Sequence, residues 1–196
     1  REQQAQLVYR QALTDLEASQ AWPELARALR IVAEMARAGG DEAGAEELSR
    51  RALEAAQKAG DRGLRYELLR DEVVLARARG QREVLRNGLA EMSALLAAQG
   101  NYAEAARLYA EALRATPDNA SLWYALGVTL RRLNRPEEAV EALQRVIRHG
   151  EPESLVRLAR LWLERGGVGA EREDDTSGSS PRKGRPRRGG PDRDAP

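Results

Sequence analysis

Apolar and small residues recur at a spacing of 34 residues between residues 86 and 166. The matching pairs are Leu89 and Trp123, Met92 and Leu126, Ser93 and Gly127, Leu96 and Leu130, Ala105 and Ala139, and Tyr109 and Leu143. The turn-forming residues Gly100 and Asn134 have the same spacing. A fixed period of this length predicts a stack of repeated units, in which each unit packs on its neighbours.

The repeated units are predicted to be helical. Ala, Leu, Glu and Arg, which are strong helix formers, dominate the chain, whereas aromatic residues make up 4% and Phe is absent. Gly, Asp, Asn and Pro interrupt the apolar periodicity at short intervals, and Pro136 and Pro152 are placed as first helical residues. We predict an all-α fold with antiparallel neighbours. Its helices are expected near residues 3–18, 23–38, 42–59, 62–79, 82–98, 102–115, 120–133, 136–149 and 153–165.

The repeated unit resembles the tetratricopeptide repeat (TPR) family. The family pattern has an aromatic residue, a Leu-Gly pair and another aromatic residue on the first helix, then Ala and a large residue on the second. Here these positions are Trp123, Leu126-Gly127, Leu130, Ala139 and Leu143. A later first helix has Leu155, Leu158-Ala159 and Trp162, and is expected to cap the array. The resemblance implies an α-α superhelix, a TPR-like helical repeat solenoid that binds other proteins.

The pattern divides the chain into three parts. Residues 86–166 are predicted to be TPR repeats with a terminal capping helix. Residues 1–85 are predicted to be degenerate TPR-like repeats, because the pattern returns there at a shift of 60, which is not a multiple of 34. The helix at 62–79 therefore either interrupts the array or belongs to a degenerate repeat. Residues 167–196, rich in Gly, Pro and Arg, are predicted to form a disordered tail.

Net charge and composition limit the classes of partner and the location that we expect for this chain. The net charge is +1, so the chain as a whole does not resemble a nucleic-acid-binding or membrane-surface protein. Cysteine is absent and no apolar run approaches the ~20 residues of a membrane span, so we expect a cytoplasmic location. The preference for Arg over Lys suggests a GC-rich, bacterial gene. Because the sequence begins at Arg1, it is expected to be a fragment or a processed form.

No residue pattern predicts an enzyme active site, a cofactor or a metal. The single histidine, His149, has no catalytic partner nearby in sequence, and no Gly-Lys-Ser/Thr phosphate loop is present. The tryptophans Trp22, Trp123 and Trp162 would suit an aromatic cage, but the last two occupy packing positions of the repeat. We therefore interpret them as core residues.

The resemblance implies that the first helix of each unit lines a concave face. Helical spacing of three and four residues separates a candidate binding face from the core stripe. Its residues are Asn87, Glu91, Ser121, Tyr124, Val128, Arg132, Arg157 and Arg160. This mildly apolar face with arginines at one end would suit an extended peptide or a partner helix. The alternative is a solvated face without a ligand.

The tail contains a second candidate site. Its sequence is similar to the AT-hook motif, in which a thin Gly-Arg-Pro core lies in the A·T minor groove while flanking basic residues contact phosphates. The residues concerned are Arg182, Lys183, Gly184, Arg185, Pro186, Arg187 and Arg188. The alternative is a charged low-complexity tail, and the acidic residues around the motif favour it.

Together these features predict a protein–protein interaction or scaffold module with a protein or peptide partner, no small-molecule substrate and no membrane. Two alternatives stay open. In the first alternative, the chain is a DNA-associated regulator that its tail anchors on A·T-rich DNA. In the second, it is the sensor part of a larger bacterial transcriptional regulator.

Overall fold

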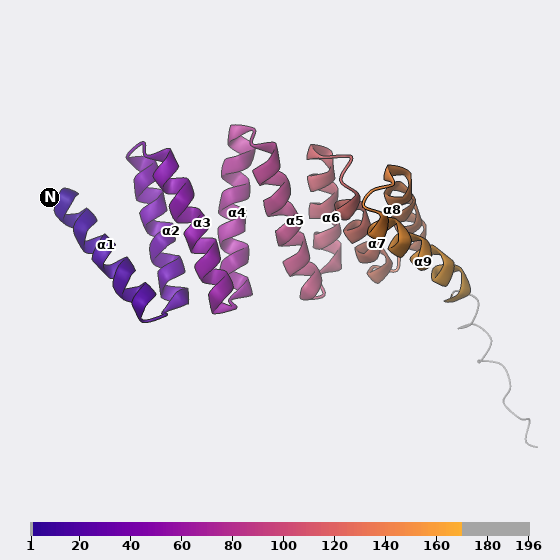
Figure 1. Ribbon diagram of the computed structural model, residues 1–196, viewed down its shortest axis with the longest axis horizontal. Helices are drawn as coiled ribbons and strands as arrows, with labels where there is room; N and C mark the ends of the chain where they lie inside the picture. Colours follow the sequence, from indigo (N-terminus) through magenta and orange to yellow (C-terminus); the bar gives the residue numbers. More distant parts are fainter. Residues whose placement is uncertain (1, 170–196) are drawn as a thin grey trace, which may run out of the picture.

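The computed structural model describes residues 2–169, which form nine α-helices and no strand. These helices are α1 (Glu2–Ala18), α2 (Trp22–Ala38), α3 (Glu42–Ala59), α4 (Arg62–Arg79), α5 (Arg82–Ala98), α6 (Tyr102–Ala115), α7 (Ala120–Arg132), α8 (Pro136–His149) and α9 (Glu153–Gly169). Each helix packs on the next in chain order, so the helices form a row along the long axis of the molecule (Figure 1). The predicted all-α repeat solenoid is confirmed. None of the described helices is long and apolar enough to cross a membrane.

Short polar turns end one helix and start the next. Gly60 ends α3 with a left-handed φ of 67°, and the Asp61 side chain then accepts a hydrogen bond from the Leu64 backbone N–H at 2.9 Å. The Asn119 side chain caps α7 in the same way, accepting from the Leu122 N–H at 3.0 Å. Such caps satisfy backbone donors that lack a partner in the first turn. Helices joined by turns this short return alongside one another.

The last helix differs from the sequence prediction in the role of Pro152 and in the residue at which the helix ends. Pro136 is the first residue of α8, as predicted, but Pro152 precedes α9, and its carbonyl accepts hydrogen bonds from Leu155 and Val156. Pro152 therefore has the place of a cap and is not the first helical residue. The helix α9 also continues past residue 165 to Gly169, because glycine weakens a helix by about 1 kcal/mol without preventing it. The rest of the predicted tail lies outside the described residues.

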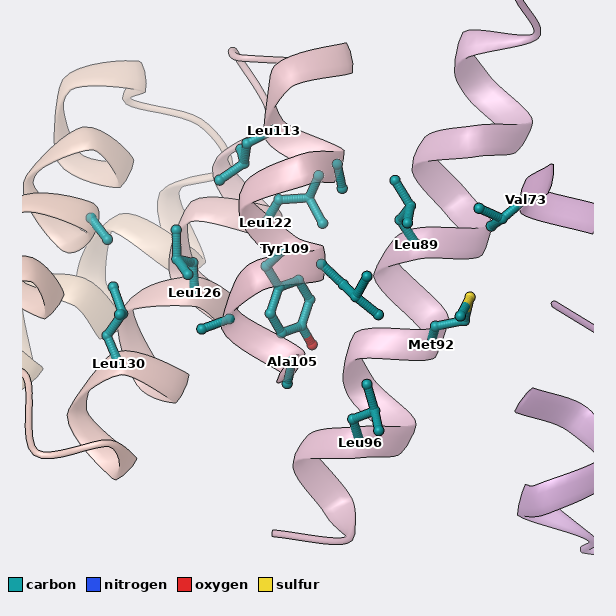
Figure 2. Packing of buried hydrophobic residues seen from close by; sticks show 14 of the residues in the cluster. Val73, Leu89, Met92, Leu96, Ala105, Tyr109, Leu113, Leu122, Leu126 and Leu130 are labelled. Atoms are coloured by element: carbon teal, nitrogen blue, oxygen red, sulfur yellow. The ribbon is translucent and has the colours of Figure 1, made fainter. Parts of the chain in front are cut away.

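The core of the C-terminal half is built from the repeat positions. The first-helix residues Leu89, Met92, Leu126 and Leu130 are all buried in one cluster. Tyr109 of α6 lies between the α5 and α7 side chains of this cluster (Figure 2). One second-helix residue therefore packs on the first helices of two successive units. The predicted repeat packing is confirmed over this region.

Small residues mark the points where helices come closest. A Cβ atom on Gly127 of α7 would lie 3.0 Å from Leu143 Cγ and 3.3 Å from the Ala139 carbonyl oxygen of α8. A Cβ on Gly88 of α5 would lie 2.6 Å from Val73 Cγ2 of α4. Contacts this short require that something shift. Glycine at these positions lets α4 and α5, and α7 and α8, approach this closely.

The N-terminal half contains a second hydrophobic cluster. Helix α4 contributes side chains to both clusters and so connects them. The α2–α3 pair buries Leu29 and Ala52 in the N-terminal cluster. Helix α4 adds Leu68 to that cluster, whereas its Leu69 and Val73 are buried in the C-terminal cluster. The helix predicted to disturb the repeat thus belongs to the continuous stack.

We predict that Gly127→Leu destabilises the fold. The new side chain would overlap Leu143 and the α8 backbone, and overpacking of this kind costs on the order of 1–3 kcal/mol. The free energy of unfolding should be measured by urea denaturation, with Glu141→Ala on the exposed surface of α8 as the control. An unchanged free energy of unfolding for Gly127→Leu would contradict the close approach of α7 and α8.

Candidate partner-binding surface

Helix α7 has a buried face and an accessible face. Leu126 and Leu130 point into the core, whereas Val128 is half-buried and Ser121 and Arg132 are exposed. The accessible residues are separated by seven and four positions, which places them along one line on the helix surface. The structure thus brings Ser121, Val128 and Arg132 together on one side of α7.

Tyr124 also contributes to packing. Its half-buried ring packs on a small cluster that includes Val146 of α8, Ala159 of α9 and the partly buried Trp162. Tyr124 therefore connects α7 to the last described helices while keeping part of its surface accessible.

The two residues of α5 that were predicted to bind a partner differ in how accessible they are to it. Asn87 is exposed, and its amide oxygen accepts hydrogen bonds from the neighbouring Arg86 guanidinium at 2.8 and 3.1 Å. Glu91 is half-buried and forms an ion pair with Arg65 of α4. Its charge is therefore already compensated within the protein. Sequence reasoning missed Arg65, because its partner lies on another helix and no local spacing signals the pair.

On α9 both predicted arginines are exposed. The Arg157 guanidinium lies 3.6 Å from the Glu153 carboxylate, one turn earlier on the same helix, and Arg160 is exposed one turn further along. An exposed pair of this kind contributes little to stability. Arg157 and Arg160 are thus accessible to a partner.

One residue expected in the α9 core is exposed. Ala159 is buried as predicted, but Leu158 is 43% exposed, as is Leu161. In each preceding unit a second helix covers the first, and no second helix follows α9 among the described residues. Leu158 lacks that cover, which explains the difference from the repeat pattern.

The three tryptophans do not form a cage. Trp22 packs on the N-terminal cluster and its ring lies under the Lys58 ammonium at 4.5 Å. Trp123 and Trp162 pack at the other end of the molecule. The Trp123 indole N–H donates to the Pro117 carbonyl at 2.7 Å. These contacts support their interpretation as packing residues, each covered by a cation on one side.

Comparison with known proteins agrees with this architecture. Residues 92–154 and 129–174 match the model of the tetratricopeptide repeat family. The chain is similar to the crystal structure of YrrB, described as a TPR protein with an unusual peptide-binding site, with a TM-score of 0.46 and 19% identity over 76% of this chain and 86% of that one. A crystal structure of MamA gives a TM-score of 0.44 and 13% identity, covering 78% of this chain and 95% of that one. No curated protein matches the chain in sequence.

Proposed function

We propose that this chain, whose residues 92–174 match tetratricopeptide repeats, is a protein-interaction module that binds a partner peptide or helix. The proposed binding surface is the concave face formed by the first helices α5, α7 and α9. The observation that carries this proposal is the line of accessible residues on α7, where half-buried Val128 lies between exposed Ser121 and exposed Arg132. An apolar side chain of a partner would cover Val128 at the centre of this line.

The dimensions of α7 suit a short peptide. A helix of 13 residues is about 20 Å long, at 1.5 Å per residue. An extended peptide of about six residues covers the same length, at about 3.3 Å per residue. Small residues on this face, such as half-buried Ala125, let a ligand backbone approach closely. The surface can therefore hold a segment rather than a single side chain.

Charge indicates which residues the partner carries. Arg132 is at the C-terminal end of α7, and Arg157 and Arg160 are exposed on α9. Guanidinium groups bind carboxylates in a planar, two-pronged geometry. Glu91 does not offset these charges, because Arg65 already pairs with it. We therefore propose a partner segment that combines an apolar residue, placed against Val128, with an acidic residue.

DNA binding by the tail is proposed as a second function, on the sequence Gly184-Arg185-Pro186 and its basic neighbours alone. These residues lie outside the part of the chain that the structure describes. The proposal is independent of the helical repeats. It would add an anchor on A·T-rich DNA to a module that binds protein.

We predict that Val128→Glu weakens peptide binding by the α7 face. Peptides would be selected from a random library displayed on phage against the wild-type chain, and their affinity measured by fluorescence anisotropy. A carboxylate buried against an apolar ligand residue should weaken binding by about tenfold or more.

The matched control is Val140→Glu, which makes the same change on exposed Val140 of α8. Thermal melts of both variants separate lost binding from lost folding. Equal affinity of Val128→Glu and Val140→Glu would move the binding surface away from α7.

For the tail, we predict that the full chain binds an A·T-tract duplex more tightly than a G·C duplex. The affinity should fall with salt by a log–log slope of about −0.9 for each neutralised phosphate. Arg185→Ala should remove the A·T preference, whereas Arg182→Ala should weaken both duplexes alike. Equal binding of both duplexes by the wild-type chain would leave only a charged tail.

A further inference from the structure

A hollow of about 250 Å³ opens between α2, α3, α4 and the start of α5. Its apolar lining includes Leu53, Leu68, Leu75 and Val84, and charged side chains from α2, α3 and α4 surround them. The volume is below the several hundred Å³ of a typical drug-sized pocket, so it suits one or two side chains. It involves none of the α7 residues of the proposed peptide surface.

The hollow lies where the two hydrophobic clusters meet. Leu68 belongs to the N-terminal cluster, the next residue Leu69 belongs to the C-terminal cluster, and partly buried Leu53 packs against both. Helix α4, which breaks the 34-residue register, connects the two clusters at this point. Because the side chains of α4 do not fill the space beside α2 and α3, a hollow remains there.

Each arginine of the hollow has a carboxylate within 4.0 Å, although the Nε atoms of Arg30 and Arg37 are buried without a hydrogen-bond partner. Arg30 of α2 lies 2.8 Å from Asp71 of α4, and Arg79 of α4 lies 3.1 Å from Glu46 of α3. Arg50 pairs with acidic residues on its own helix, and Arg37 has a carboxylate 4.0 Å away. The Arg30, Arg37 and Arg79 pairs link α2, α3 and α4 around the opening, whereas the Arg50 pairs lie within α3.

Glu72 is the exception among the charged residues of the hollow. Within the described residues it has no hydrogen-bond donor and no cation within 4.0 Å. Burial, and then the neighbouring negative charge of Glu91, raise the pKa of the Glu72 carboxyl above its ordinary value. A raised folded-state pKa means that the ionised carboxylate destabilises the fold, and that this penalty disappears as the pH falls. Glu72 is therefore an uncompensated acid beside an apolar floor.

We propose that this hollow binds a cationic side chain of a peptide, with the aliphatic part of an arginine or lysine on Leu68 and Leu75 and its charged head on Glu72. Long basic side chains combine an apolar stem with a charged tip, and the hollow offers the complementary pair of surfaces. An acidic ligand would have to compete for the arginines with the carboxylates that already lie beside them. A purely apolar ligand would leave the Glu72 carboxylate desolvated without a partner. The proposal does not depend on peptide binding by α7.

The test is an NMR titration of the full chain with assigned leucine methyl groups. The probes are acetyl-arginine-amide, the uncharged aliphatic analogue acetyl-norleucine-amide, and acetyl-glutamate-amide. The arginine probe should shift the Leu68 and Leu75 methyl signals in a saturable way and bind about tenfold more tightly than the norleucine probe, as a charge-assisted hydrogen bond implies. Equal binding of these two probes, tighter binding of the glutamate probe, or no shift with the arginine probe would overturn the proposal.

Glu72→Gln separates a binding role from a structural one. It should reduce the affinity for the arginine probe about tenfold and at the same time raise the melting temperature of the free protein at pH 7, because it removes an unpaired, half-buried charge. Glu141→Gln, the same change on the exposed surface of α8, should alter neither quantity. An unchanged affinity of Glu72→Gln for the arginine probe, or a lowered melting temperature, would contradict the proposal that Glu72 is unpaired in the free protein and binds the cationic head of the ligand.

Discussion

The array depends on how closely neighbouring helices approach. Without Phe, the core is filled mainly by Leu, Ala and Val, whose side chains reach only a short distance. The helices must therefore come together until backbone and side chain touch, and Gly127 and Gly88 provide that approach against α8 and α4. Because well-packed interiors leave little free volume, each contact fixes the position of the next helix. The faces left uncovered then form the proposed binding surfaces.

Helix α4 shows how an irregular unit is accommodated. It buries Leu68 with the N-terminal helices and Leu69 and Val73 with the C-terminal ones, so the stack stays continuous although the sequence period fails. Ion pairs such as Arg30–Asp71 link α4 to α2 at the surface. The same misfit leaves the hollow with the unpaired Glu72. The proposed α7 surface thus belongs to the regular repeats, and the proposed cation-binding hollow belongs to the irregular step.

The sequence predicted what local spacing and composition determine. Helix positions followed from capping residues such as Asp61 and Asn119, and the core of α5–α8 followed from the 34-residue period. Contacts between helices whose spacing is not periodic were missed: the Arg65–Glu91 pair, the approach of Gly88 to Val73, and the unpaired Glu72. Leu158 was misplaced because the period assigns a core position without showing whether a covering helix follows. The α7 face stays a prediction until a ligand is bound.

The most direct test of close packing between α4 and α5 is a double-mutant cycle on Gly88 and Val73, read out as the free energy of unfolding in urea. Gly88→Ala alone should destabilise the protein, because its Cβ would lie 2.6 Å from Val73 Cγ2. In a Val73→Ala background the same change should become neutral or stabilising, since Ala is favoured over Gly in a helix by about 1 kcal/mol. That reversal of sign is the predicted coupling between neighbours in contact. If Gly88→Ala stabilises the wild-type chain by the same amount as in the Val73→Ala background, the two helices do not meet there, and the continuous array through α4 is contradicted.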